Sequence, residues 1–194
     1  MKSLLFTLSI LLMTSSIAQD KKELPFVEIS ETPKNHSAGS TVSRMIDGLG
    51  YRYYWASEAL TNENLNYKPS EDSRNTIETI QHIYDLSVTI KNVAAKKVNL
   101  RPYVKSKLSY EELREATLFN LKEASELFAK TEHVEEHVVA FQKADKTNEY
   151  PFWNFLNGPL ADAIYHTGQI VSFRRTSGNP MSNKVRVFTG KNAE

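Results

Sequence analysis

The sequence predicts an all-α fold, a four-helix bundle with one long crossover between helices three and four.

 Three observations support this class. Four stretches carry apolar residues at steps of three or four, which is the period of an amphipathic helix. Capping residues stand before the second and third stretches. A connection of about 27 residues, 131–157, separates the third stretch from the fourth, and one such crossover is common in helix bundles.

The composition limits the possible functions. The 194 residues are enough for one domain with extensions, and 40% of them are apolar, which is enough for a core. The net charge of +1 gives no reason to expect a nucleic-acid partner or an anionic membrane surface. The chain has no cysteine, so disulfides, thiolate metal ligands and a cysteine nucleophile are excluded.

Residues 1–18 have the pattern of a secretory signal peptide. Lys2 precedes an apolar run from Leu4 to Met13, and Ser16-Ile17-Ala18 forms a small-x-small cleavage site. The run is shorter than the ~20 apolar residues of a transmembrane helix. We expect cleavage near Ala18 and a periplasmic or secreted protein without a membrane partner after cleavage; an uncleaved anchor is the alternative.

The remaining chain divides into three parts. Residues 19–40 contain two prolines and little periodicity, so we expect a linker or an N-terminal arm. Residues 41–180 contain the four helical stretches. The tail, 181–194, alternates weakly, which favours a short strand or an extended cover.

The first helix is expected over 41–60 and the second over 76–95. Gly48 and Gly50 weaken the first helix but allow another helix to approach closely. The second helix begins at Asn75, with Glu78 placed to complete a capping box. The apolar stripes of the two helices are Val42, Met45, Leu49, Tyr53, Ala56 and Leu60, and then Ile77, Ile80, Tyr84, Val88 and Ile90.

The third helix begins at a capping box, Ser109-Tyr110-Glu111-Glu112. The fourth begins after Asn157-Gly158, with Pro159 in its first turn, and ends near Gly178 and Pro180. The apolar stripe of the third helix is Leu113, Ala116, Leu121, Ala124 and Phe128. That of the fourth is Ile164, Ile170, Val171 and Phe173. The long connection between these helices is expected to fold over the bundle, because structureless links of this length are uncommon.

Two groups of histidines are candidate metal ligands. His133 and His137 form an H-x-x-E-H pattern that one class of zinc proteases uses, but its helical context is missing, and we expect a solvated loop instead. His82 lies on the second helix, while Asp162 and His166 share one face of the fourth. Inward-facing ionisable groups need partners, and a shared metal ion would provide one.

Each of these three residues also has an ordinary explanation. A histidine on a helix is often a satisfied core residue, and an aspartate in a first helical turn interacts with the positive helix end. As a set, two imidazoles and one carboxylate suit zinc, or iron in a facial triad, and leave a position for water or substrate. Trp153, in an aromatic segment, is either a core residue or part of a pocket rim. Arg174 and Arg175 are expected at a solvated helix end, with an anionic ligand as the alternative.

Two segments, "LNYKPSEDSRNTIETIQHI" and "ADAIYHTGQIVSFRRTSGNP", resemble the signature regions of the DinB-like (DinB/YfiT) superfamily. The resemblance covers about residues 41–180, and the signal peptide is similar to those of secreted members from Bacteroidetes. It implies a four-helix bundle that binds one divalent metal through three histidines. His82 and His166 match two of these histidines. Asp162 stands where the family has the third, and this departure leaves the identity and the presence of the metal open.

The resemblance also implies thiol-dependent transferase or isomerase chemistry, although export would separate this chain from cytoplasmic thiols.

Our first hypothesis is an exported metal-binding protein that acts as a metal-dependent transferase or hydrolase on an unknown small molecule. Zinc or nickel is the expected ion, and manganese or iron is the alternative. Gln169, one turn after His166, is expected to orient a ligand or nucleophile. The rival hypothesis is a metal-free, non-catalytic bundle, and a homodimer is compatible with either.

Overall fold

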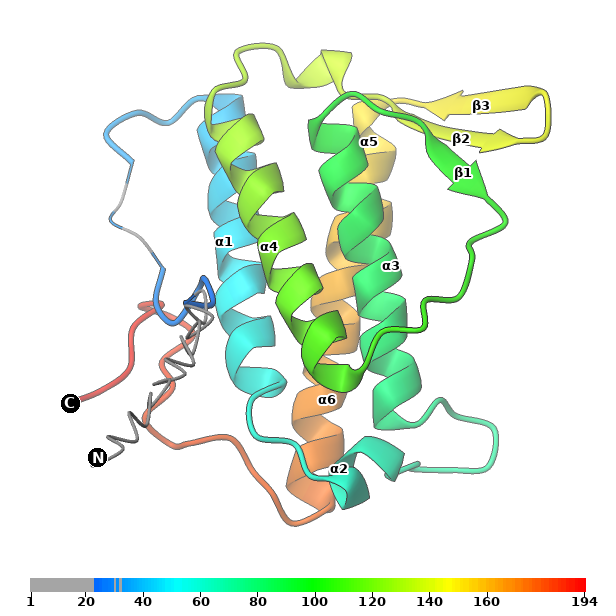
Figure 1. Cartoon of the computed structure of the whole chain (residues 1–194). Coiled ribbons are helices and arrows are strands. Elements are labelled where there is room, and N and C mark those ends of the chain that lie inside the picture. The colour runs from blue at the N-terminus through cyan, green and yellow to red at the C-terminus, as the bar shows by residue number, and fades with distance from the viewer. Residues whose placement is uncertain (1–22, 30, 32) are drawn as a thin grey trace, which may run out of the picture.

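Four long helices form the body of the protein and run side by side (Figure 1). This computed structural model describes residues 23–29, 31 and 33–194, so the predicted signal peptide lies outside the described residues. The long helices are α1 (Ala38–Ala56), α3 (Thr76–Ala94), α4 (Tyr110–Ala129) and α6 (Ala161–Thr176). The shorter helical segments are α2 (Asn62–Asn66), the 3-10 turn η1 (Val134–Glu136), α5 (Phe152–Phe155) and the π-helical segment η2 (Leu156–Leu160).

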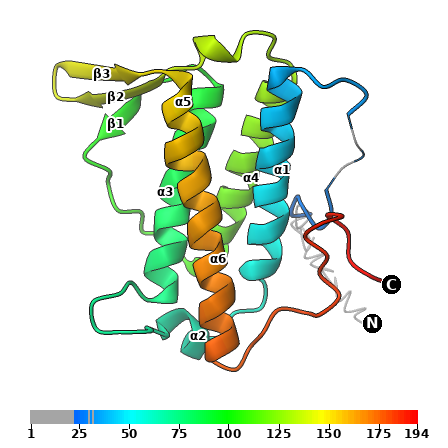
Figure 2. The ribbon, with the colours of Figure 1, turned by 180° about the vertical axis from the view of Figure 1, so that it is seen from behind.

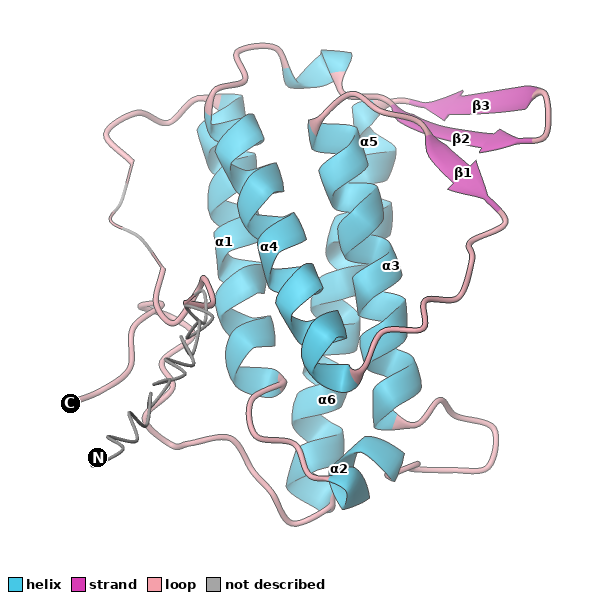
Figure 3. Ribbon diagram, viewed as in Figure 1, coloured by secondary structure: helices cyan, strands magenta, loops and turns pink. Residues whose placement is uncertain are grey.

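The predicted all-α fold class is wrong, because the chain also forms a three-stranded mixed sheet at one end of the helices (Figure 3). The strands are β1 (Asn99–Arg101), β2 (Val139–Lys143) and β3 (Lys146–Tyr150). β1 pairs with β2 in parallel, with Asn99 opposite Phe141, and β2 pairs with β3 in an antiparallel hairpin. The fold is therefore mixed α/β. The parallel pairing joins segments about 40 residues apart, and local periodicity contains no sign of such a contact.

The helix starts follow the capping signals in the sequence. Asn75 and Glu78 form the predicted capping box of α3, and Ser109 and Glu112 form that of α4. In each box the first side chain accepts a hydrogen bond from the backbone N–H three residues on, and the glutamate returns the contact. α1 begins earlier than predicted, behind the Ser37 cap, and ends at Ala56 rather than residue 60.

The apolar faces of the long helices meet in two clusters. α4 packs against both α1 and α3, while α6 closes the opposite side between them (Figure 2). Phe128 and Phe155 lie in the cluster nearer the sheet, and Tyr53, Ile80 and Ile170 lie in the other. None of the described helices is both long and apolar enough to cross a bilayer.

The N-terminal arm and the C-terminal tail pack together beside α1 (Figure 1). The Ile29 backbone N–H donates to the Gly190 carbonyl at 2.7 Å, and the Tyr51 hydroxyl donates to Asn192 at 2.8 Å. A Cβ on Gly50 would lie 2.5 Å from the Phe26 ring, so this glycine allows the arm, rather than another helix, to approach α1. The described tail contains no strand, so the predicted short strand is wrong, and the extended cover is the alternative that stays.

Arg174 is buried, which corrects its expected place at a solvated helix end. Its guanidinium donates to the carbonyls of Trp55 and Ala56 at the end of α1, at 2.8 and 3.1 Å, and to the carbonyl of Asn179 at 2.7 Å. These carbonyls have no partner within their own helix, so the side chain of α6 caps α1. Arg175, the next residue, is exposed.

Asp47 is a partly buried carboxylate between α1 and α4. Ser125 Oγ donates to its Oδ1 at 2.5 Å. Burial raises the pKa of Asp47 above its usual value, and the Ser125 hydrogen bond and the charge of Arg44 only partly oppose this shift. A raised carboxyl pKa means that ionisation costs stability, so the contribution of Asp47 is largest at low pH and falls as the pH rises through the raised pKa.

Asp47→Asn should remove this pH dependence, because the amide oxygen still accepts from Ser125 but does not ionise. We expect the variant to gain stability relative to the wild type between pH 4 and pH 7, values that bracket the usual and raised carboxyl range. Urea unfolding of both proteins at the two pH values measures this difference. An unchanged difference between the two proteins across this range would contradict the assignment.

Candidate metal centre

The capped helix α3 provides the first candidate ligand. His82 lies two turns into α3, on the side that faces α6. Asn75 caps α3, so its first turns are fixed and the histidine has a defined position. The residues around it on this helix alternate between core and surface, which places the imidazole at the boundary between them.

A break before α6 sets the direction of the other two ligands. Gly158, with φ −91° and ψ −107°, interrupts the helical path within η2, and Pro159 follows it. α6 then begins at Ala161, so Asp162 lies in its first turn, where the helix dipole favours a carboxylate. His166 follows one turn later on the same face. The sequence prediction of a helix start after Asn157-Gly158 is close to this arrangement.

The structure brings His82, Asp162 and His166 together. Asp162 Oδ2 lies 3.2 Å from His82 Nε2, and Asp162 Oδ1 lies 3.3 Å from His166 Nε2. One ligand atom from each residue lies within 4.8 Å of the other two. The two short separations involve different oxygens of Asp162, so the grouping of one atom per residue within 4.8 Å is the observation that bears on a shared ion.

Gln169 defines the tautomer of His166. Its Oε1 lies 2.7 Å from His166 Nδ1, and an amide oxygen only accepts, so Nδ1 carries the hydrogen. In the neutral ring Nε2 then carries no hydrogen, and it lies 3.3 Å from Asp162 Oδ1 without a hydrogen bond between the two atoms. A cation near both atoms would stabilise two electron-rich groups at this distance. Gln169 therefore orients a ligand, rather than contacting a reacting group itself.

The three side chains differ in exposure. His166 is 11% exposed and His82 28%, whereas Asp162 is 41% exposed, so solvent reaches the site on the carboxylate side. Burial lowers the pKa of His82, and the positive charge of Arg74 lowers it further, while the hydrogen bond to Asp162 acts in the opposite direction. The net effect favours the neutral imidazole, which is the form that binds metals.

An open cleft of about 660 Å³ adjoins the centre, and His82 forms part of its wall. Arg74 and Lys105 also line it, and neither was identified from the sequence. Arg74 precedes His82 by eight residues, about two helical turns, so helix geometry could have placed the two on one side. Lys105 had no such signal, because the segment after β1 brings it across to α3.

Trp153 does not join the three candidate ligands. It lies on α5, is 71% exposed, and lines a separate, mostly apolar pocket of about 460 Å³ with Val42 and Phe152. This placement agrees with a pocket rim but puts the pocket away from the candidate metal centre.

The H-x-x-E-H stretch forms no second metal site in the described chain. His133 is exposed and contacts Glu135, as a loop residue would. The expectation of a solvated loop is wrong for His137, which is only 3% exposed. Its Nδ1 lies 3.0 Å from the Val93 carbonyl, and its Nε2 lies 3.1 Å from the Thr131 hydroxyl. The pattern alone could not show that this loop turns one histidine inward.

No family model, curated protein or solved structure matches the chain. The resemblance to the DinB/YfiT superfamily therefore stays a prediction.

His137→Ala should lower the free energy of unfolding by about 1–3 kcal/mol, because it removes a partner from each of two buried polar groups. His133→Ala is the matched control and should change it by less than ~0.5 kcal/mol, as exposed substitutions do. Urea unfolding curves of the two variants make the comparison. Equal effects would show that the internal hydrogen bonds of His137 contribute nothing to stability.

Proposed function

We propose that the chain binds one divalent metal ion through His82, Asp162 and His166, and that it acts as a metal-dependent transferase or hydrolase on a small molecule. The observation that carries this proposal is the orientation of His166. Gln169 accepts from its Nδ1–H, so Nε2 is left without a hydrogen 3.3 Å from Asp162 Oδ1, and a cation bound to both atoms would stabilise them. His82 Nε2 faces the other oxygen of the same carboxylate.

The ligand set favours certain ions. Two imidazoles and one carboxylate suit zinc and nickel, and they also suit manganese or iron. The carboxylate is harder than the histidine that the family resemblance implies at position 162, which moves the preference toward harder ions. Three protein ligands leave at least one position open, and the exposed side of Asp162 is where water would enter.

Such an ion supplies Lewis-acid chemistry and lowers the pKa of a bound water or other nucleophile. The protein residues have separate roles in this proposal. His82 and His166 hold the site from two different helices, while Gln169 fixes the ring orientation of His166. Asp162 balances part of the positive charge and remains accessible to a proton from solvent.

The rival function is a metal-free binding or structural protein. In that case Asp162 would accept a hydrogen bond from His82 at 3.2 Å, the one of its two histidine contacts that has hydrogen-bond geometry. The two functions differ in metal content, which makes that content the deciding measurement.

The protein is dialysed with zinc, nickel, manganese or iron, and the unbound metal is then removed. It should retain about one ion per chain. His82→Ala and His166→Ala should each abolish retention, because two remaining ligands seldom hold an exchangeable ion against buffer. Asp162→Ala should weaken it, and Asp162→His should shift the preference toward nickel and zinc. Elemental analysis measures all five proteins.

His133→Ala is the control, since it removes an exposed histidine outside the site and should leave the metal content unchanged. Circular dichroism of each variant checks that the helices are retained. Bound metal should also raise the melting temperature of the wild type. Equal, negligible metal in every protein would favour the metal-free function, and retention that survives both histidine substitutions would refute these ligands.

A further inference from the structure

The cleft beside the candidate metal centre has two walls from distant parts of the chain. Arg74, Glu78 and His82 come from the start of α3 and the residue before its cap. Tyr103 and Lys105 come from the segment between β1 and α4. His82 belongs both to this wall and to the metal centre, whereas Asp162 and His166 do not line the cleft, so a molecule in the cleft meets the centre at His82.

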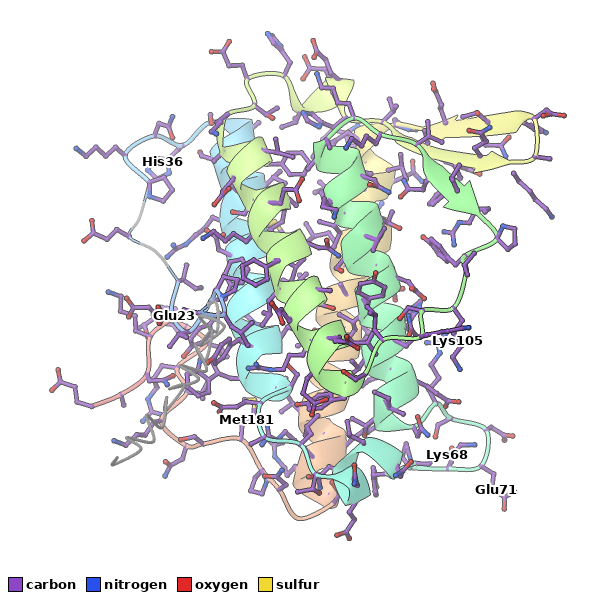
Figure 4. All side chains as sticks on the ribbon, in the orientation of Figure 1. Glu23, His36, Lys68, Glu71, Lys105 and Met181 are labelled. Atoms are coloured by element: carbon purple, nitrogen blue, oxygen red, sulfur yellow. The ribbon has the colours of Figure 1, made fainter. Side chains whose placement is uncertain are left out.

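Three basic side chains line the cleft without a fixed partner. Lys68, Arg74 and Lys105 form no hydrogen bond or ion pair with another residue in the described part of the chain. Arg74 and His82 line the same cleft, so the guanidinium lies on the wall that leads to the metal centre. Figure 4 shows Lys105 on the segment beside α3 and Lys68 on the loop below it. These cations are free to bind an anionic group.

The acidic side chains of the cleft are engaged or lie at its outer end. Glu78 accepts from the Asn75 backbone N–H as part of the α3 cap. Asp85 accepts from Gln81 at 3.1 Å, and burial raises its pKa. Glu71 lies at the tip of the loop and points outward, and Asp72 is its neighbour (Figure 4). Glu78 is held by the α3 cap and Asp85 by Gln81, whereas Arg74 and Lys105 form no hydrogen bond or ion pair in the described chain, so these two cations remain to bind an anion.

The walls also contain apolar side chains. Ile77, Leu108 and Leu113 line the cleft along with the charged groups. Arg74 precedes His82 by eight residues, which corresponds to about 12 Å along a helix. A molecule that reached both would be elongated, with an apolar middle.

We propose that the substrate of this site is an elongated carboxylate, whose anionic end Arg74 and Lys105 bind while its reactive end reaches the ion at His82. This assignment rests on the proposed metal-dependent function. The planar guanidinium of Arg74 matches a carboxylate in two hydrogen bonds, and Lys105 adds a second charge from the facing wall.

Two hydroxamic acids test the assignment on metal-loaded protein. Suberic acid monohydroxamate and octanohydroxamic acid carry the same metal-binding group and chains of similar length, but only the first ends in a carboxylate. We expect the carboxylate probe to bind about three- to tenfold more tightly, as partly exposed charged hydrogen bonds allow. Isothermal titration calorimetry gives both dissociation constants.

Arg74→Gln and Lys105→Gln should each reduce this preference and leave the affinity for octanohydroxamic acid unchanged. Arg175→Gln, which removes an exposed arginine outside the cleft, is the matched control and should retain the full preference. Equal affinities of the wild type for both probes, or a preference that survives Arg74→Gln and Lys105→Gln together, would overturn the assignment alone. A wild type that retains no metal would instead contradict the proposed function, and the assignment with it.

Discussion

The Asp162 carboxylate, placed between the imidazoles of His82 and His166, is the interaction on which the functional account depends. Its two oxygens face one ring each, at 3.2 and 3.3 Å. The rings belong to different helices, so this contact also joins α3 to α6 on the side of the body that α4 does not cover (Figure 2). A site built from two packed helices is more rigid than one built from loops.

Several local features maintain this arrangement. The Asn75 cap fixes the beginning of α3, and the break at Gly158 turns the chain so that Asp162 falls in the first turn of α6. Gln169 orients His166, and Arg174 attaches the far end of α6 to the last carbonyls of α1. Each feature constrains a different part of α6, so the position of the site follows from the packing of the whole body.

Features that depend on nearby residues could be predicted from the sequence. The four long helices, the Asn75 and Ser109 caps, and the shared face of Asp162 and His166 all follow from spacings within a few turns. The sheet could not be predicted, because β1 is short and its partner lies far along the chain. Burial of His137 and Arg174 also depends on tertiary contacts, so polar sequence alone indicated solvated positions for both.

X-ray absorption spectroscopy of the metal-loaded protein tests the central claim most directly. The account predicts a first shell of nitrogen and oxygen ligands, at about 2.0–2.2 Å if the ion is zinc, with outer-shell scattering from two imidazole rings. In His82→Ala the contribution of one ring should disappear from any ion that remains. A spectrum without imidazole scattering, or one that His82→Ala leaves unchanged, would contradict an ion held between α3 and α6.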